Sequence, residues 1–219
     1  MIFNSLEFAI FLPVVFILYW LVLGRMRTAQ NGFLVLASYV FYGWWDWRFL
    51  FLIFASSLVD YVVGLCLGKA AEGQKKQRGF LLGTSLVVNL GLLGVFKYYN
   101  FFAESLAEAV TFFGHQPDIA TLSWILPVGI SFYTFQTLSY SIDVYRKNME
   151  PVRDPVAFFA YVSFFPQLVA GPIERASHLV PQFMRPREFS YGQATDGLRQ
   201  ILWGLFKKMV IADNCAVLV

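Results

Sequence analysis

Long runs without charged residues alternate with short charged segments along most of the chain. Residues 8–24, 79–96, 119–142 and 156–173 each lack Asp, Glu, Lys and Arg. A bilayer core of ~30 Å needs about 20 apolar residues in a helix that crosses it. The pattern therefore predicts membrane helices, and the first is expected to be uncleaved because no small-residue cleavage site follows it.

Two further apolar runs, 31–45 and 49–68, are separated only by residues 46–48. Trp44 and Trp45 lie beside this short segment, and tryptophan side chains prefer the depth of the lipid headgroups. We expect two antiparallel helices joined by a tight turn at a membrane interface.

The distribution of positive charge sets the expected orientation. The loop 69–78 carries four Lys and Arg residues, whereas the stretch 97–118 carries one Lys and three acidic residues. Because short loops rich in Lys and Arg stay in the cytoplasm, the loop 69–78 is expected inside and the N-terminus outside. Apolar positions at helical spacing over 102–113 predict a short helix lying on the outer surface.

The segment 156–173 is predicted to be re-entrant. If it crossed the membrane, the four arginine residues between 175 and 199 would lie outside, against the usual charge bias. The segment also contains Pro166 and the pair Gly171 and Pro172, and proline breaks helices because it lacks an amide donor. Irregular backbone survives at membrane depth only where protein or a water-filled cavity surrounds it. We therefore expect the segment to dip into the core and return to the cytoplasmic side.

The C-terminal part is expected to place a polar loop, 174–197, on the inner side. An apolar stripe at helical spacing follows over 198–209, and its helix is expected to begin at the inner surface, with Lys207 and Lys208 on that surface. No internal repeat or flexible linker interrupts the chain, so residues 1–219 are predicted to form a single transmembrane domain, the N-terminal part of a longer one. The predicted fold class is all-α, a polytopic integral membrane helix bundle with one re-entrant segment.

Composition narrows the class of protein. Hydrophobic residues make up 58% of the chain and charged residues 14%, whereas soluble domains average about 45–50% apolar and about 25% charged. This composition alone could still describe an unusually apolar soluble core, but the charge-free runs exclude a soluble enzyme, a nucleic-acid-binding domain and a disordered tail, and the net charge of +3 then reflects loop topology. Cys66 and Cys215 lie far apart, so neither a disulfide framework nor a metal site is predicted.

Polar side chains recur on one face of the helix that is predicted to end near residue 143. Most of them share a face at helical spacing: Tyr133, Gln136, Thr137, Tyr140 and Asp143. Polar groups inside a bilayer face protein or water. These residues either form hydrogen bonds between helices or line a substrate cavity, and the spacing does not separate the two interpretations.

Asp60 and Asn89 are predicted to lie at similar depths, about 12 and 15 Å from the inner ends of neighbouring helices at 1.5 Å per residue. A functional role is the default hypothesis for a carboxyl group inside a membrane. Mutual hydrogen bonding of Asp60 with Asn89 is the interpretation that we favour.

The two histidines are expected to be surface residues. His115 and His178 lie in polar loops, and neither is expected to have a partner at i+3 or i+4, or an acidic neighbour that would orient it. A metal site or a nucleophile–base pair would need such partners. Since the chain also lacks phosphate-binding, dinucleotide-binding and Gly-x-Ser-x-Gly motifs, the residues alone predict no reaction.

Two long motifs resemble the membrane-bound O-acyltransferase family. The run 126–146 begins Leu-Pro-Val-Gly-Ile-Ser-Phe-Tyr, and the run 164–175 reads Phe-Phe-Pro-Gln-Leu-Val-Ala-Gly-Pro-Ile-Glu-Arg. The segments 1–5 and 37–45 are similar to the bacterial branch that O-acetylates exopolysaccharides such as alginate. The resemblance covers nearly the whole chain and implies helices around a tunnel, through which an acyl group passes towards an acceptor on the far side.

The resemblance also implies roles for individual residues. A substrate tunnel would use the polar helix face and the broken segment, namely Tyr133, Gln136, Tyr140, Asp143, Pro166, Gly171 and Pro172. A basic mouth suited to a phosphate-bearing acyl donor would comprise Arg146, Arg175, Lys207 and Lys208. The donor, acetyl-CoA or a carrier-bound acyl group, would be a substrate, and neither a bound cofactor nor a metal is expected.

Location and partners follow from the same resemblance. We expect a multi-pass protein of the bacterial inner membrane that contacts membrane lipid, the acyl donor and an extracytoplasmic acetyltransferase partner protein, but no nucleic acid. The family's central histidine belongs to an Arg-Trp-His-Ile-Ser-type segment, and nothing in residues 1–219 matches it. No catalytic residue is therefore assigned, and the chain alone is expected to be inactive.

Two alternative functions stay open. The same family includes acyltransferases that move D-alanine onto teichoic acid. A membrane transporter would share the broken membrane segment and the intramembrane polar groups, but it should show paired halves of inverted topology, which this sequence does not show.

Overall fold

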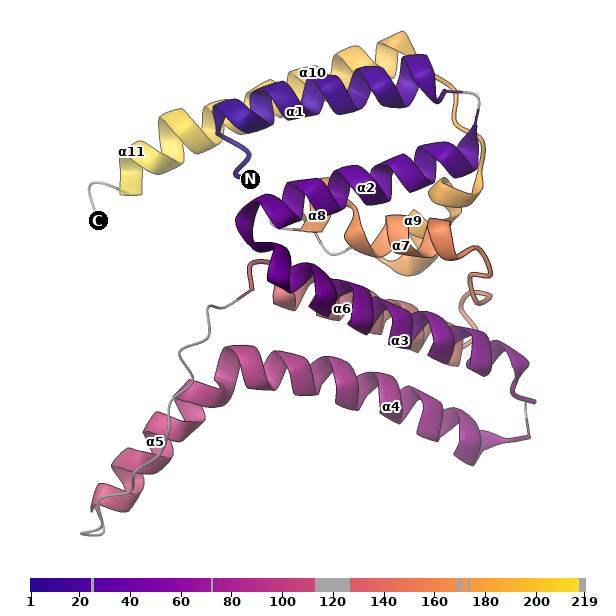
Figure 1. Ribbon diagram of the computed structural model, residues 1–219, viewed down its shortest axis with the longest axis vertical. Helices are drawn as coiled ribbons and strands as arrows, with labels where there is room; N and C mark the ends of the chain where they lie inside the picture. Colours follow the sequence, from indigo (N-terminus) through magenta and orange to yellow (C-terminus); the bar gives the residue numbers. More distant parts are fainter. Residues whose placement is uncertain (25, 72, 113–126, 169–170, 173, 217–219) are drawn as a thin grey trace.

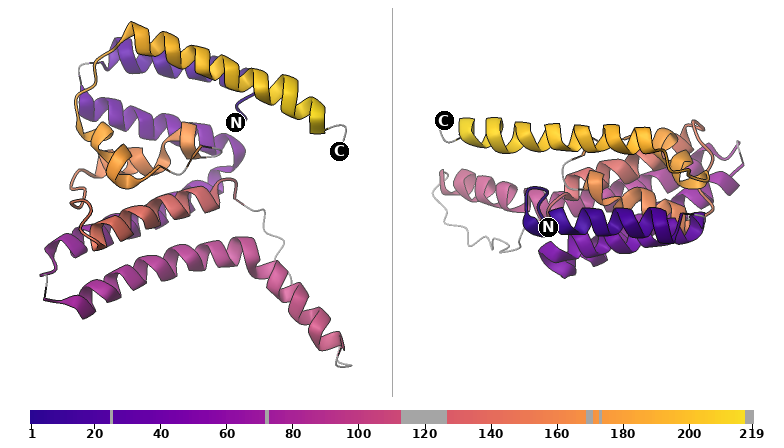
Figure 2. Two further views of the ribbon diagram at one scale, coloured as in Figure 1. Left: turned by 180° about the vertical axis from the view of Figure 1, so that it is seen from behind. Right: turned by 90° about the horizontal axis from the view of Figure 1, so that it is seen from above.

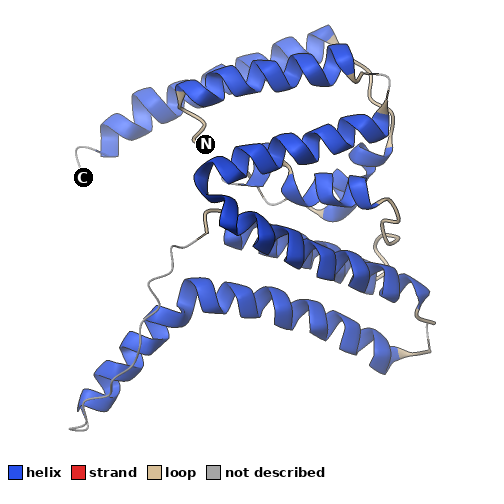
Figure 3. Ribbon diagram, viewed as in Figure 1, coloured by secondary structure: helices blue, strands red, loops and turns tan. Residues whose placement is uncertain are grey.

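The computed structural model describes residues 1–24, 26–71, 73–112, 127–168, 171–172 and 174–216, and the regular secondary structure of these residues is helical throughout (Figure 3). The helices are α1 (Leu6–Ile17), α2 (Arg27–Asp46), α3 (Leu50–Lys69), α4 (Lys75–Leu93), α5 (Tyr99–Phe112), α6 (Ile130–Tyr145), α7 (Pro155–Ser163), α8 (Phe165–Leu168), α9 (Ala176–Met184), α10 (Tyr191–Phe206) and α11 (Asp213–Ala216). The predicted all-α class is confirmed for this part of the chain.

The first helices run back and forth beside one another (Figure 1). Helices α2 and α3 contain 20 residues each, about 30 Å at 1.5 Å per residue. A single 3-10 turn, Trp47–Phe49, joins them, and the Asp46 carboxylate stabilises it by accepting from the Arg48 backbone N–H at 2.9 Å. The predicted tight turn is thus confirmed.

Two continuous helical stretches of the described chain are long and apolar enough to cross a membrane, Arg27–Lys69 and Lys75–Phe112. The first doubles back at its 3-10 turn. The second bends where a π-helical turn, Gly94–Tyr98, joins α4 to α5 (Figure 1), and π-bulges are a known cause of helix kinks. The helix predicted over 102–113 therefore exists as α5, but it continues α4 directly. Residue 113, the last of the predicted range, lies outside the described residues.

Helix α6 begins later than the apolar run 119–142 predicts. Residues 113–126 lie outside the described part of the chain, and α6 starts at Ile130. Gly129 precedes it with φ 77°, a left-handed conformation that favours glycine. Pro127 and this turn therefore set the start of the helix.

The segment predicted to be re-entrant is a broken helix. Helix α7 ends at Ser163, Phe164 has non-helical ψ of 107°, and α8 begins at Phe165. Pro166 accounts for the break because its ring would clash with the carbonyl group four residues earlier in a continuous helix. The freed Phe165 N–H donates to the Ser38 hydroxyl of α2 at 3.1 Å.

The expected polar loop 174–197 is wrong in one respect, because it contains a helix. Helix α9 buries Ala176, Val180 and Phe183 on one face, a helical spacing that the sequence already carries. Helix α10 likewise begins at Tyr191, ahead of the apolar stripe, with the Ser190 hydroxyl accepting from the Gln193 N–H at 3.4 Å.

Burial on α4 is inverted relative to a helix of a soluble protein. On α4, Arg78, Ser85 and Asn89 are buried, whereas Phe80 and Val87 are 75% and 73% exposed. On this helix, polar side chains thus face neighbouring helices and these large apolar ones face outward, while the rest of the core is largely apolar.

Candidate functional site

A polar network links α3, α4 and α6 at the centre of the bundle. The Asp60 carboxylate, fully buried on α3, accepts from the Asn89 amide at 2.7 Å, from the Ser141 hydroxyl at 2.8 Å and from the Ser85 hydroxyl. Thr137 donates to the Asn89 side-chain oxygen at 3.1 Å. The predicted pairing of Asp60 with Asn89 is confirmed.

Gln136 joins α6 to the broken helix. Its amide donates to the Tyr161 carbonyl at 2.7 Å, and the Tyr161 hydroxyl donates back to the Gln136 carbonyl at 2.9 Å. The Gln136 amide also lies 3.4 Å from the Gln167 side-chain oxygen, and Gln167 donates to the Pro172 carbonyl at 2.8 Å. These contacts hold the chain on both sides of the break at Phe164.

Tyr133 and Tyr140 are buried in the same core, with 2% and 0% exposure. The Tyr140 hydroxyl accepts from the Val152 N–H at 3.1 Å, and its ring packs on Phe158 with centroids 4.8 Å apart. Gly64 of α3 lies against this ring so closely that an added Cβ would be 2.4 Å from the hydroxyl oxygen. Tyr140 therefore fixes the approach of α3 to α6.

Asp143 ends the polar face of α6. One carboxylate oxygen accepts from the Asn148 amide at 3.2 Å, while the other, Oδ2, is buried without a hydrogen-bond partner in the described part of the chain.

Gly171 lies against the broken helix, since an added Cβ would be 2.6 Å from the Gln167 Cα.

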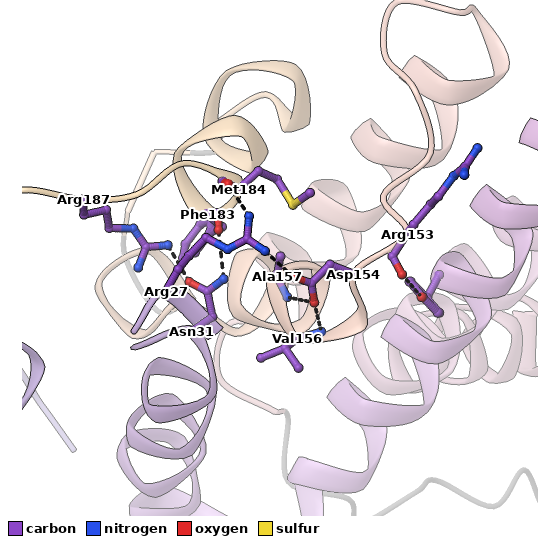
Figure 4. A network of polar contacts seen from close by, with 10 residues as sticks. Arg27, Asn31, Arg153, Asp154, Val156, Ala157, Phe183, Met184 and Arg187 are labelled. Carbon is purple, nitrogen blue, oxygen red and sulfur yellow. Dashed lines mark hydrogen bonds and ion pairs between the residues drawn. The ribbon is translucent and has the colours of Figure 1, made fainter. Parts of the chain in front are cut away.

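Arg27, the first residue of α2, contacts both the residue that caps the start of α7 and the last residue of α9, at one end of the molecule (Figure 4). Its guanidinium donates to the Met184 carbonyl at 2.6 Å and lies 3.7 Å from the Asp154 carboxylate. Asp154 in turn caps α7 by accepting from the Val156 and Ala157 N–H groups at 3.0 and 3.2 Å. The chain therefore enters through α7 and returns through α9 to the same end of the bundle.

Arg78, in the first turn of α4, binds the ends of two other helices at that side. Its guanidinium donates to the carbonyl groups of Leu67 at 2.7 Å and Tyr145 at 2.8 Å, at the C-terminal ends of α3 and α6. Carbonyl groups at helix C-termini lack partners within the helix and carry partial negative charge, so a cation is stabilising there.

Two apolar cavities flank α8. The larger, about 720 Å³, lies between the N-terminal segment, α1, the end of α2, α8 and α10, and Phe165, Pro166, Trp45 and Lys208 line it. The smaller, about 290 Å³, lies between α1, α2, α8 and α9. Pro166 lines both cavities, and none of the other six predicted tunnel residues lines either one.

The structure does not bring the four predicted donor-mouth residues together. Arg146 follows α6 at the end that holds Arg78, and Arg175 precedes α9. Lys208, by contrast, shares the larger cavity with Trp45, at the opposite end of α2 from Arg27. Helix α10 starts at Tyr191, ahead of the apolar stripe, and ends at Phe206. Lys207 and Lys208 therefore lie in the π-helical turn after its last residue and not at its start.

The expectation that His178 lacks an acidic neighbour is wrong. Its Nδ1 lies 3.3 Å from the Glu174 carboxylate, four residues earlier, and both side chains are exposed. His115 falls outside the described residues. Within the described residues, no three His, Cys, Asp or Glu side chains gather in a group that could hold a metal ion.

The chain is similar over its whole length to bacterial O-acetylases. It is 43% identical over 220 residues to the Pseudomonas aeruginosa protein named probable alginate O-acetylase AlgI, matching 100% of this chain and 41% of that protein. The Azotobacter vinelandii protein of the same name is 43% identical over 218 residues, with 99% and 42% covered. A Helicobacter pylori protein named peptidoglycan O-acetyltransferase is 35% identical over 245 residues, with 99% and 45% covered.

These names confirm the resemblance to O-acyltransferases that the sequence motifs predict. The chain spans about two-fifths of the length of the alginate O-acetylases that it matches. No family model and no solved structure matches it.

Sequence reasoning missed several residues that organise this site. Arg27, Asn31 and Ser38 of α2 hold the broken helix and the α9 region, and Asn31, fully buried, donates to the Phe183 carbonyl at 2.9 Å (Figure 4). The signal was present, because Gln30, Asn31 and Ser38 are polar positions inside an apolar run, and such positions face protein in a membrane.

Proposed function

We propose that this chain is the N-terminal portion of a multi-pass O-acyltransferase of the bacterial inner membrane. It takes part in moving acetyl groups across the membrane for O-acetylation of an exopolysaccharide such as alginate. The observation that carries this proposal is the match along the whole chain, at 43% identity, to proteins named probable alginate O-acetylase. A peptidoglycan acceptor is the second candidate, because one relative at 35% identity carries that name.

The inverted burial on α4 supports the membrane placement. Asn89 is fully buried and Val87, two residues earlier on the same helix, is 73% exposed. In water this arrangement would expose apolar surface while burying polar groups. In lipid the apolar side chains face the acyl chains and the polar groups find partners inside the protein.

The charge distribution supports the orientation with the N-terminus outside. Arg27, Arg78 and Arg146 lie at one end of the bundle, next to the loop that carries Lys69 and Lys75. The exposed tryptophans Trp44, Trp45 and Trp47 lie at the other end of α2. Cationic loops on the cytoplasmic side and an interfacial tryptophan cluster fit this orientation.

The broken helix supports a tunnel wall. Helix α8 stands between the two cavities, and Pro166 contributes to both. Acetyl-CoA or a carrier-bound acyl group approaches from the basic side, an extracytoplasmic acetyltransferase partner receives the acetyl group, and a histidine outside these 219 residues serves as the general base.

The test of activity compares the 219-residue chain with the complete protein, each purified in detergent with an acetyl donor and with alginate or peptidoglycan fragments as acceptor. We expect transfer from the complete protein and at least 10²-fold less from the 219-residue chain, because losing an essential base forfeits about 10²–10⁴-fold in rate. Equal turnover would direct attention to His178. Transfer by the complete protein to peptidoglycan fragments alone would make peptidoglycan, and not alginate, the acceptor. No transfer to alginate or to peptidoglycan would overturn the proposed function.

The test of topology uses single cysteines at Asp154 and Ser177, with Cys66 and Cys215 replaced by serine. A membrane-impermeant thiol reagent should label both positions in inverted vesicles and neither in intact cells. Labelling of the two positions from opposite sides would show that 156–173 crosses the membrane.

A further inference from the structure

The smaller cavity is a narrow apolar slot that opens beside one arginine. It has a volume of about 290 Å³, and its apolar walls come from α1, α2, the α7–α8 break and α9, including Leu12, Val15, Leu34, Phe164, Leu179 and Phe183. Arg187 and Gln182 contribute polar groups to the lining. An apolar slot with a cation at its edge suits a ligand with an apolar tail and an anionic head.

Arg187 is held in place by neutral groups. Its guanidinium donates to the Gln182 carbonyl at 3.1 Å, to the Tyr19 hydroxyl and to the Asn31 side-chain oxygen. The same group lies 5.2 Å from the centre of the Phe183 ring and 5.8 Å from that of Tyr19. Asn31 is itself fixed by its bond to the Phe183 carbonyl, so the guanidinium is oriented before any ligand arrives (Figure 4).

The positive charge of Arg187 is not neutralised within the described residues, where no carboxylate pairs with it. Asp154, by contrast, pairs with Arg27 nearby. A guanidinium carries five N–H donors, and the three bonds of Arg187 leave two of them for a ligand. A planar fork of this kind matches a phosphate group in geometry and charge.

We propose that this slot holds one acyl chain of an anionic phospholipid, with the lipid phosphate on Arg187. The mouth lies at the Arg27 end of α2, which is the cytoplasmic end in the orientation proposed above, so a lipid of the inner leaflet reaches it. Basic pockets between membrane helices on this side are a known mode of anionic lipid recognition. The inference rests on the proposed membrane placement and is independent of acetyl transfer.

The test counts bound lipids on the complete protein by native mass spectrometry. The protein is purified in a neutral detergent and titrated with phosphatidylglycerol or phosphatidylcholine of identical acyl chains. Wild type should bind one phosphatidylglycerol at least fivefold more tightly than phosphatidylcholine, and Arg187→Gln should abolish this preference. Arg185→Gln is the matched control, since Arg185 is exposed, lies two residues earlier and loses the same charge.

Leu179→Trp provides a second variant, because it fills the apolar slot and leaves Arg187 in place. It should weaken binding of both lipids to this site, and inorganic phosphate at millimolar concentration should not displace the bound lipid. Equal binding of the two lipids by wild type, an unchanged preference in Arg187→Gln, a lost preference in Arg185→Gln, or displacement by phosphate or by acetyl-CoA would each overturn the site. Acetyl transfer by the same preparations is measured separately, so a failed lipid site and a failed proposed function are distinguishable.

Discussion

Helices α6 and α10 each contain 16 residues, but the bundle uses them in opposite ways. Nine residues of α6 are buried, whereas none of the residues of α10, all of them described, is buried. The view from above in Figure 2 shows α10 along one edge of the molecule, although it overlaps α1 in Figure 1. The larger cavity separates α10 from α1 and α8.

The difference teaches which residues mark a buried helix in this protein. The buried positions of α6 include Thr134, Gln136, Thr137 and Ser141, and its Phe135 is 46% exposed. Helix α10 has the clearer apolar stripe and the weaker packing. In the membrane placement proposed above, hydrogen-bonding side chains therefore indicate helix contacts better than an apolar face does.

The largest expected effect comes from removing the acceptor at the centre of the α6 contacts. Asp60→Ala leaves the donors of Ser85, Asn89 and Ser141 without their shared partner in a fully buried site. We expect the free energy of unfolding to fall by about 3 kcal/mol, since unpartnered buried donors cost about 1–3 kcal/mol each and hydroxyl groups can partly rebond to backbone. Unfolding in mixed micelles followed by circular dichroism measures this change.

Asp196→Ala on α10 is the control for that substitution. Asp196 is exposed and bonds only to Gln200 among the described residues, at 2.8 Å, so its removal should leave unfolding nearly unchanged. Similar losses at both positions would mean that the contrast between α6 and α10 does not extend to stability.

The next comparison removes an apolar side chain from each helix. Leu138 of α6 is 5% exposed and Leu202 of α10 is 66% exposed. Leu138→Ala should lower the free energy of unfolding by about 2 kcal/mol, the lower end for buried leucine, because the cavity loses packing contacts while lipid contributes no hydrophobic gain. Leu202→Ala should change it by less than about 0.5 kcal/mol. An equal loss at Leu202 would show that α10 is packed in the folded protein.

A steric test addresses the close contact between α3 and α6. Gly64→Ala would place a Cβ 2.4 Å from the Tyr140 hydroxyl oxygen, and Tyr140 cannot yield because it is fully buried. Such overpacking should cost about 1–3 kcal/mol. In Gly83→Ala on α4 the added Cβ meets nothing within 4 Å, so that control should gain helix propensity, up to about 1 kcal/mol. Thermal unfolding of both variants checks the difference in sign.

Part of the helical framework could be predicted from charge-free runs, because the runs 8–24 and 79–96 largely coincide with continuous helical stretches of the structure. The turn at 46–48 followed from the short gap between two apolar runs, and the break near Pro166 followed from the backbone chemistry of proline. Helix α9 was missed because its nine residues lie in a stretch rich in charge. That charge favoured a loop over the helix that the four-residue spacing of Ala176 and Val180 indicates. Its docking against α7 depends on contacts with Arg27, which lies more than 150 residues away.

The candidate site was predictable in part for the same reason. Matched depth was enough to pair Asp60 with Asn89, since both lie in runs with few other polar groups. Spacing on α6 named Gln136 and Tyr140 but could not distinguish hydrogen bonds between helices from cavity lining, and the partners Tyr161 and Val152 lie on segments with no polar pattern of their own. Lys208 was expected beside Arg146 but lines the larger cavity with Trp45, because α10 begins at Tyr191, ahead of the apolar stripe.

The smallest expected effect tests whether the α6 network acts as a unit. The Asn89 amide donates to Asp60 and its side-chain oxygen accepts from Thr137, so Asn89 bridges α3 and α6. A double-mutant cycle with Asp60→Asn and Asn89→Ala should give a coupling free energy of about 0.6 kcal/mol, the average for hydrogen bonds between membrane helices. Because the Ser85 and Ser141 hydroxyls also reach Asp60, they remain to hold the amide in the single variant, which keeps the coupling modest. Unfolding of the four proteins in mixed micelles measures this coupling. If the effects of the two substitutions on the free energy of unfolding simply add, then Asp60 is held by the serine hydroxyls and Asn89 contributes only its hydrogen bond with Thr137.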